Sequence, residues 1–210
     1  MLAPCDHATG IAARIRFSAV VEQPWRPTRA QVEAARGRPV PDVIGAGLRV
    51  VFCGINPSLY SAAVGHHFAR PGNRFWPSLH GAGFTERLLS PFEDARLPAH
   101  CLGCTNVVEG ATARADELGP AELRAGGARL AGRLRRYRPA WLAVLGLGAY
   151  RVAFDRPDAT LGRQPERLGV TAVWVLPNPS GLNAHYQLPA LVERFAEFRA
   201  AALAGGGEGR

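Results

Sequence analysis

The chain contains no lysine, and all 25 of its basic side chains are arginines. A P-loop needs a lysine beside the bound phosphates, so this class of nucleotide site is excluded. Lysine is also the usual amine that forms a Schiff base with a carbonyl substrate. Covalent catalysis through lysine is therefore excluded, and the amino terminus is the one amine left for such a role.

Long hydrophobic runs are missing as well. No apolar stretch reaches the roughly 18 residues that a membrane-spanning helix needs. Charges and prolines stand near the amino terminus, where a signal peptide has an apolar segment. We therefore expect a cytoplasmic protein without membrane contact.

Cysteine is scarce, with four residues in the chain. Cys101 and Cys104 have the Cys-x-x-Cys spacing of some redox and metal sites. No second pair accompanies them, and Cys53 stands in an apolar run, where buried thiols are common. We interpret the cysteines as structural and predict no metal and no cofactor.

The composition is that of one globular domain, with 47% hydrophobic and 20% charged residues in 210. The net charge of +8 suits a polyanionic partner, because basic residues on phosphates release counterions. Basic proteins need not bind nucleic acid, so charge alone leaves the partner open.

Apolar strand-like runs alternate with helical stretches from position 48 onward. The predicted strands cover 48–53, 102–108, 140–145 and 171–176, and the predicted helices cover 73–81, 120–137, 148–154 and 188–202. Continuous apolar strands separated by helices indicate a parallel sheet covered on both faces. The expected class is α/β, with three α/β/α layers around a mainly parallel sheet.

We expect three segments. Residues 1–46 contain several prolines and read as a partly ordered extension, in which Thr28 can cap a short helix over 29–36. The arginines of this extension either help to hold a nucleic acid or only keep the extension solvated, and we favour the second interpretation. Residues 47–203 form the main domain, and the glycine-rich 204–210 form a flexible tail.

Two asparagine-bearing loops follow apolar strands and carry the clearest functional signal. The first runs Gly54-Ile55-Asn56-Pro57-Ser58-Leu59 and continues to Asn73-Arg74-Phe75-Trp76, and the second reads Pro177-Asn178-Pro179-Ser180-Gly181-Leu182-Asn183. Loops that leave the carboxyl ends of parallel strands line one crevice. Amides, backbone N–H groups and an aromatic ring in that crevice suit a flat heterocycle and a water molecule.

These two motifs resemble the mismatch-specific uracil-DNA glycosylases, the branch of the uracil-DNA glycosylase superfamily that includes thymine-DNA glycosylase. The resemblance covers about positions 46 to 203. It implies a uracil-DNA glycosylase-like fold and a monomeric enzyme that flips uracil and related altered pyrimidines out of double-stranded DNA with G:U or similar mismatches. The N-glycosidic bond is then hydrolysed, which leaves an abasic site for base excision repair.

The resemblance assigns Asn56 to holding the attacking water and Asn178 to facing the uracil carbonyl. It places Asn106 near the site. Asn-Pro is also ordinary turn chemistry, but within the longer motif we favour catalysis for Asn56. Glu109 follows in the next loop and is a candidate general base, although an exposed loop glutamate is usually only solvated.

Base binding falls on the first loop. Phe68 is either a core residue or a platform for the flipped base, and its polar neighbours favour the platform. By resemblance, the backbone N–H groups near Ile55 and Phe68 bind the pyrimidine edge. Ser61 and Ala62 are expected beside the 5-position of the base.

DNA contact falls mostly on the second loop. By resemblance Leu182 is the wedge that fills the space of the flipped nucleotide, rather than a buried loop residue. Gly181 and Asn183 would face the orphaned guanine. The remaining expected DNA contacts are Ser180, His185, Arg70 and Arg74. Ser180 is not a nucleophile elbow, because the Gly-x-Ser-x-Gly pattern is absent.

The chain departs from the family pattern at two places. Ser58 stands where the family commonly has glycine, which would alter the approach of the loop to the base. Asn183-Ala184-His185 replaces a Ser-Arg continuation, so a phosphate or guanine contact must come from elsewhere, with His185 as one candidate. Strict G:U specificity is therefore open.

Two other functions are compatible with parts of the sequence. Gly146-Leu147-Gly148-Ala149-Tyr150 follows an apolar strand and suggests a dinucleotide cofactor, but the third glycine and the ribose-binding acid are missing. The other rival is a non-catalytic protein that binds mismatched or damaged DNA.

Overall fold

A computed structural model describes residues 25–204. The sheet has five strands in the order β2-β1-β3-β5-β4. Four of them, β1 (Val50–Gly54), β2 (Leu102–Asn106), β3 (Trp141–Leu145) and β5 (Thr171–Leu176), pair in parallel. The edge strand β4 (Gly162–Leu168) runs antiparallel to β5. The mainly parallel sheet that the sequence predicts is confirmed.

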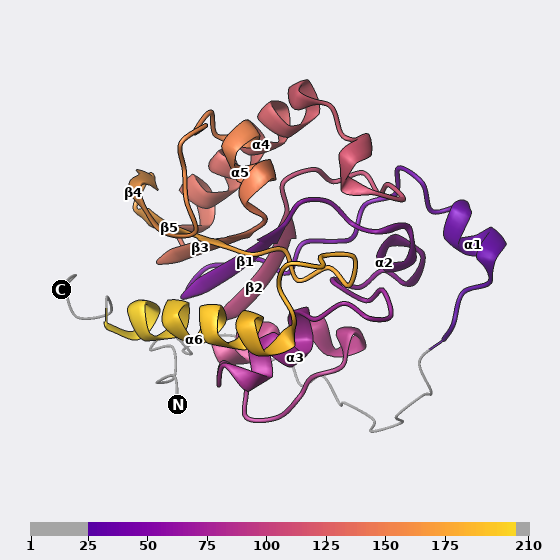
Figure 1. Ribbon diagram of the computed structural model, residues 1–210, viewed down its shortest axis with the longest axis horizontal. Helices are drawn as coiled ribbons and strands as arrows, with labels where there is room; N and C mark the ends of the chain where they lie inside the picture. Colours follow the sequence, from indigo (N-terminus) through magenta and orange to yellow (C-terminus); the bar gives the residue numbers. More distant parts are fainter. Residues whose placement is uncertain (1–24, 205–210) are drawn as a thin grey trace.

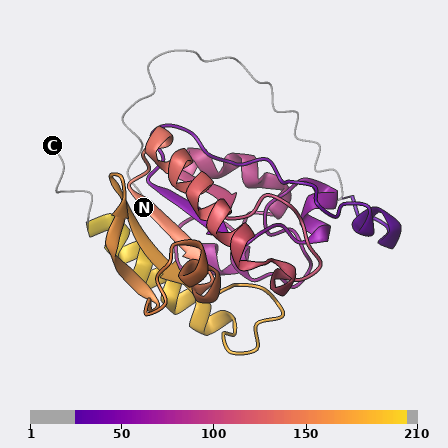
Figure 2. The same ribbon diagram turned by 90° about the horizontal axis from the view of Figure 1, so that it is seen from above.

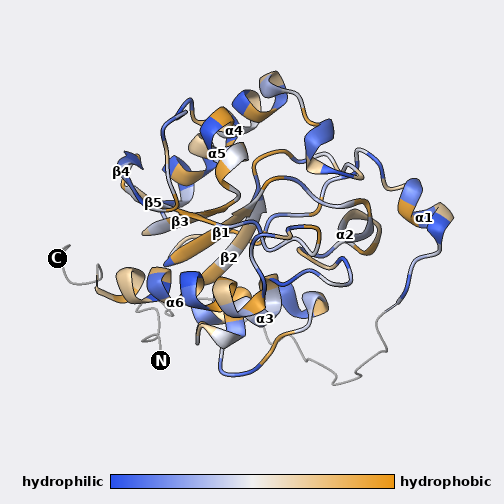
Figure 3. Cartoon of the chain, viewed as in Figure 1, coloured by the Kyte–Doolittle hydropathy of each residue, from blue (hydrophilic) through white to orange (hydrophobic). Residues whose placement is uncertain are grey.

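Alternate residues of the buried strands enter two separate cores. Val50 and Phe52 of β1 belong to one hydrophobic cluster, and Val51 and Cys53 belong to the other. All four side chains are fully buried. A strand that is covered on both faces reads as a continuous apolar run, which is why β1 shows no polar alternation. Figure 3 shows β1 hydrophobic over most of its length, whereas hydrophilic and hydrophobic residues both occur along α4.

Helices cover both faces of the sheet (Figure 1). On one face lie α4 (Pro120–Tyr137) and α5 (Leu147–Ala153), and on the other lie α3 (Phe75–Gly81) and α6 (Leu188–Ala204). The core that contains Phe52, between the sheet and the α3 and α6 side, is aromatic: the Phe52 ring centroid lies 5.3 to 6.0 Å from those of Phe75, Phe84, Phe195 and Phe198. The three-layer α/β/α architecture is confirmed.

Several elements were not predicted from the sequence: β4, the short helix α2 (Leu59–Val64), and the 3-10 segments η1 (Pro91–His100) and η2 (Ala115–Glu117). The predicted strand 102–108 ends earlier, at Asn106. The consecutive N–H groups of Val107 and Val108 both donate to the chain at the end of β1, at Gly54 and Ile55, whereas successive N–H groups of an extended strand point to opposite sides. The helix expected over 29–36 is α1 (Arg29–Glu33), with the capping box at Thr28.

The described end of the predicted extension packs against the main domain. Val43 forms an antiparallel bridge with Cys104. Ala35 and Val40 are buried in a small cluster with Leu59 and Ala62 of α2. Residues 1–24 and 205–210, which include about half of the predicted extension and most of the predicted tail, lie outside the described residues.

The loop between β5 and α6 lies at the same end of the molecule as α2 in both views (Figures 1 and 2). This end is formed by the carboxyl ends of the parallel strands, where loops of an open α/β sheet gather. Between residues 25 and 204, no helix is both long and apolar enough to cross a membrane.

Candidate functional site

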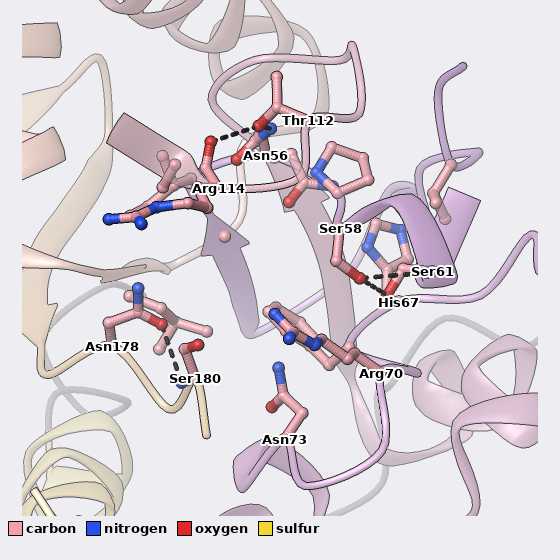
Figure 4. Close-up of a pocket in the computed structure, with 18 of the residues that line it drawn as sticks. Asn56, Ser58, Ser61, His67, Arg70, Asn73, Thr112, Arg114, Asn178 and Ser180 are labelled. Atoms are coloured by element: carbon pink, nitrogen blue, oxygen red, sulfur yellow. Dashed lines mark hydrogen bonds between the residues drawn. The ribbon is translucent and has the colours of Figure 1, made fainter. Parts of the chain in front are cut away.

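A cavity opens at the carboxyl ends of β1, β2, β3 and β5. The strand order places β3 between β1 and β5, so the cavity lies over the end of β3, at Leu145, and between the two asparagine loops. The residues expected at the site that line it are Ile55, Asn56, Ser61, Phe68, Arg70, Asn106, Asn178, Ser180 and Leu182. Figure 4 shows Asn56, Arg70 and Asn178 on different sides of this space.

The side-chain amide of Asn56 has a fixed orientation. Its Nδ2 donates to the carbonyl of Gly110 at 3.2 Å and to Oγ1 of Thr112 at 2.7 Å. The Thr112 hydroxyl itself donates to the carbonyl of Arg114 at 2.7 Å, so it can only accept from Asn56. Both contacts therefore require the amide nitrogen, and Figure 4 shows the contact with Thr112. Oδ1 remains as an acceptor with no protein donor in the described part of the chain.

Asn178 is fixed in the opposite sense. Its Oδ1 accepts from the N–H of Ser180 at 3.0 Å, which leaves Nδ2 as the available donor. Asn183 Nδ2 donates to the Asn178 carbonyl at 2.9 Å, which fixes the backbone of Asn178. The cavity thus has an amide acceptor on one wall and an amide donor on another. An acceptor suits a water proton, and a donor suits a carbonyl oxygen that gains negative charge.

Phe68 has a left-handed backbone conformation, with φ at 54°. Its ring stacks on Phe75 of α3, with centroids 4.1 Å apart and planes inclined by 26°. Within residues 25–204, no acceptor takes the Phe68 N–H. A flat ligand in the cavity can therefore contact both the ring and this donor, as the sequence predicts for a bound base.

The neighbours of Phe68 hold this conformation in place. Asp94, buried in η1, accepts from the His67 N–H at 3.0 Å and lies 2.9 Å from Nδ1 of His66. Trp76 Nε1 donates to the His67 carbonyl at 3.2 Å. A positive φ at a bulky residue is costly and persists only where the surroundings fix it. These contacts supply that constraint.

His67 lines the cavity and is only 2% exposed. Burial lowers the pKa of its imidazole below the usual value. Its Nε2 lies 3.0 Å from the carbonyl of Pro41, which can only accept, so the proton is on Nε2. The ring is therefore neutral near pH 7, and Nδ1 is its acceptor.

Gly54 leaves room for two site residues. A Cβ at this position would lie 2.5 Å from Oδ1 of Asn106 and 3.2 Å from the Phe68 ring. Asn106 is buried at the end of β2, and its carbonyl accepts from Arg133 at 2.9 Å. The side chain of Asn106 thus reaches the cavity from the strand beside β1, as expected from its place in the sequence.

Two serines, Ser58 and Ser61, line the cavity beside α2. Ser58 caps the helix by accepting from the Ser61 N–H at 3.1 Å, and the two hydroxyls are 3.1 Å apart. Ser61 Oγ also accepts from the N–H of Ala69 at 3.0 Å. Ser58 has an ordinary φ of −68°, so no glycine is required here. Ala62 does not line the cavity; it packs in the cluster with Val40.

Leu182 is 66% exposed, which fits a wedge better than a core residue. The next residue, Asn183, uses both ends of its amide within the loop: Nδ2 binds the Asn178 carbonyl, and Oδ1 accepts from the His185 N–H at 3.1 Å. Gly181 and His185 are exposed on the same loop. Contacts of these residues with DNA remain predictions.

Two other residues expected at the site, Glu109 and Arg74, lie outside the cavity. Glu109 is exposed, does not line the cavity, and forms an ion pair with Arg133 at 3.3 Å. Arg74 donates to backbone carbonyls of the loop that follows β5. General-base action by Glu109 and DNA contact by Arg74 remain predictions, and neither residue lines the cavity.

Sequence reasoning did not single out Thr112, Arg114 or Asn73, which also line the cavity. Thr112 follows Asn106 by six positions, but it contributes to the site through a hydrogen bond to Asn56, which lies 56 positions earlier. No local pattern reveals such a contact. Asn73 lies inside the first motif, and its Oδ1 accepts from the Phe75 N–H at 2.9 Å.

Metal ligands do not gather in the described part of the chain: no three His, Cys, Asp or Glu side chains there are placed to hold an ion. Cys53 and Cys104 are buried free thiols, and burial raises the pKa of each. Gly146, from the glycine pair that suggested a cofactor, has φ 141°, and a Cβ there would lie 3.1 Å from the Ile55 side chain. This glycine therefore serves close packing beside the cavity.

Comparison with known protein families identifies the family of the chain. The model of the uracil DNA glycosylase superfamily matches residues 41–203. The match includes both asparagine loops, all five strands and the residues that fix the Asn56 amide. The chain therefore belongs to the uracil DNA glycosylase superfamily, whose members hydrolyse the N-glycosyl bond of uracil in DNA.

Proposed function

We propose that this chain is a monofunctional, mismatch-directed uracil-DNA glycosylase. It flips uracil and related altered pyrimidines out of mismatched duplex DNA and leaves an abasic site. The observation that carries the proposal is the fixed amide of Asn56, which offers only Oδ1 to the cavity. An oriented acceptor holds a water molecule for attack without itself forming a covalent bond.

In the proposed reaction the C1′–N1 bond breaks, and its electron pair stays with the pyrimidine. The oxygen of the water held by Asn56 bonds to C1′, and one water proton passes to solvent. Asn178 Nδ2 donates to the uracil carbonyl, where charge develops as the base leaves. A neutral amide stabilises this anion less than a charged donor does, so we expect slow chemistry.

The absence of lysine supports a monofunctional reaction. A glycosylase that also nicks the strand forms a Schiff base through an amine, and the amino terminus is the one amine in this chain. The product is therefore expected to be an intact strand with an abasic site.

Mismatch preference is supported by the exposed Leu182 beside the cavity. An apolar wedge fills the space of the extruded nucleotide, and extrusion costs least for a mispaired base. A G:U pair is thus a better substrate than A:U.

A duplex with one labelled G:U pair tests this proposal. The labelled strand is incubated with the protein, and alkali then cleaves it at abasic sites. We expect cleavage only after alkali, more from G:U than from A:U, and no adduct after borohydride. Salt-sensitive binding without base release would instead support the non-catalytic mismatch-binding alternative, and a trapped adduct would refute the monofunctional assignment.

A further inference from the structure

The wedge loop, residues 178–187, has no regular secondary structure and carries Leu182 on its outside. Apart from the Gln187 carbonyl, which accepts from the Leu191 N–H of α6, its backbone carbonyls find no donor in a strand or helix. Hydrogen bonds within the loop, such as Asn183 Nδ2 to the Asn178 carbonyl and the Asn183 N–H to the Ser180 carbonyl, hold part of it, and contacts from elsewhere in the chain hold the rest. Its shape therefore depends on whatever donors reach it.

Most of the donors that reach the loop carbonyls from outside the loop belong to one residue. The N–H of Arg74 donates to the Pro179 carbonyl at 2.9 Å. One terminal nitrogen of its guanidinium donates to the carbonyls of Ser180 and Asn183, each at 3.0 Å. The other donates to the Tyr186 carbonyl and lies 3.4 Å from Oε1 of Gln187. Arg74 thus spans the wedge loop from the residue before Ser180 to its last residue.

The segment that carries Arg74 also touches the wedge loop directly. A Cβ on Gly181 would lie 2.6 Å from the carbonyl oxygen of Gly72. Arg74 precedes Phe75, whose ring stacks on Phe68 in the cavity wall. The base platform and the wedge loop are therefore connected through two consecutive residues of one segment.

We infer that Arg74 is a positioning residue that holds the wedge loop, and with it Leu182, in the shape needed to extrude a base. Its consequence for activity rests on the proposed function, whereas the bracing itself rests on the contacts. Arg74 does not line the cavity, and its guanidinium nitrogens are directed to protein carbonyls. This role differs from a phosphate contact, for which the same charge would have to face the DNA.

The test compares R74M with R74K and with the control R129M. Methionine keeps an unbranched stem but no donors, and lysine keeps the charge without the planar fork. Arg129 is an exposed arginine on α4 that the site does not use. Hydrogen exchange in the DNA-free protein reports the loop directly, and exchange in the strands shows that each variant is folded.

For R74M we expect exchange at residues 180–187 to rise by about tenfold or more, since hydrogen bonds from a charged donor are lost. Exchange in β1, β3 and β5 should stay unchanged. Single-turnover release of uracil from a G:U duplex should fall by about tenfold, while release from single-stranded DNA changes less than about twofold, because no extrusion is needed there. R74K should resemble R74M, and R129M should resemble the unsubstituted protein.

A double variant tests the link to the wedge. Once Leu182→Ala has removed the wedge, adding R74M should cost less than about twofold further, because two residues that act through one step are not additive. Unchanged loop exchange in R74M would overturn the inference whatever the activity. So would a uniform loss of affinity for every DNA with a salt dependence reduced by about one phosphate contact. If the unsubstituted protein released no uracil, the proposed function would fail, while loop exchange would still decide the bracing role.

Discussion

Two asparagines at the site differ in what they can offer a ligand, although their side chains are the same. Asn56 has its nitrogen bound by Gly110 and Thr112, so its oxygen is available. Asn178 has its oxygen bound by the Ser180 N–H, so its nitrogen is available. Neighbouring groups rather than residue type thus decide which atom of each amide is available to a ligand.

This difference leads to a prediction for Asn178. Asn178→Asp keeps the shape but replaces the donor with a carboxylate that repels the departing anion. We expect single-turnover release of uracil to fall by about 100-fold or more, in the range seen when an oxyanion donor is removed. Asn178→Ala, which removes the donor without adding charge, should lose less. Equal activity of Asn178→Asp and the unsubstituted protein would show that this amide does not face the uracil carbonyl.

At the level of elements, α4 packs against the loop after β2 through a glycine. A Cβ on Gly126 would lie 2.3 Å from the carbonyl oxygen of Val107. Gly132, on the same helix, has nothing within 4 Å of such an atom. The first glycine is required by close approach, whereas the second only weakens the helix.

We therefore expect opposite effects from the same substitution in one helix. Gly126→Ala should lower the free energy of unfolding by about 2 kcal/mol, because backbone atoms must move apart. Gly132→Ala should raise it by up to about 1 kcal/mol through helix propensity. Urea unfolding of both variants measures this. Similar values for the two would mean that α4 lies farther from Val107.

The sequence predicts the four parallel strands because each is a continuous apolar run between helical stretches. It does not reveal β4, whose residues include Arg163, Pro165 and Glu166 and whose pattern of burial is mixed. An edge strand is defined by its pairing partner more than by its own pattern. The helix α2 was not predicted because its residues were interpreted as part of a functional motif, although Ser58 and Gly65 cap it at its two ends.

At the site, too, the sequence predicts some features and does not reveal others. Loops after β1 and β5 were recognisable because the motifs themselves lie there. The hydrogen bonds from Thr112 and Arg74 could not be recognised, because they join residues that are 56 to 113 positions apart in the sequence. Contacts of this range depend on the strand order, which a single sequence does not show.

At the scale of the whole molecule, stability should depend on pH through His67. Its folded pKa is lowered by burial, whereas the unfolded value is about 6.5. The unfolded chain therefore takes up this proton first, and stability falls as pH drops from about 6.5 toward the folded pKa. Asp94, Asp42 and His66 also act on this pKa, but less than burial does.

His67→Gln keeps a donor for the Pro41 carbonyl but cannot titrate. We expect it to be less stable than the unsubstituted protein at pH 7.5, with a difference that narrows by several tenths of a kcal/mol or more at pH 5.5. Urea unfolding at the two pH values gives this difference, in which groups common to both proteins cancel. A difference that stays constant would contradict the lowered pKa of His67.

The central claim is that the chain releases uracil by means of a water molecule held by Asn56. Single-turnover release from a G:U duplex, with DNA affinity measured at the same salt, tests it most directly. Asn56→Ala should lose about 100-fold or more in rate at nearly unchanged affinity. Thr112→Val, which only loosens the amide, should lose about three- to tenfold. An Asn56→Ala rate within a few-fold of the unsubstituted protein would contradict the account.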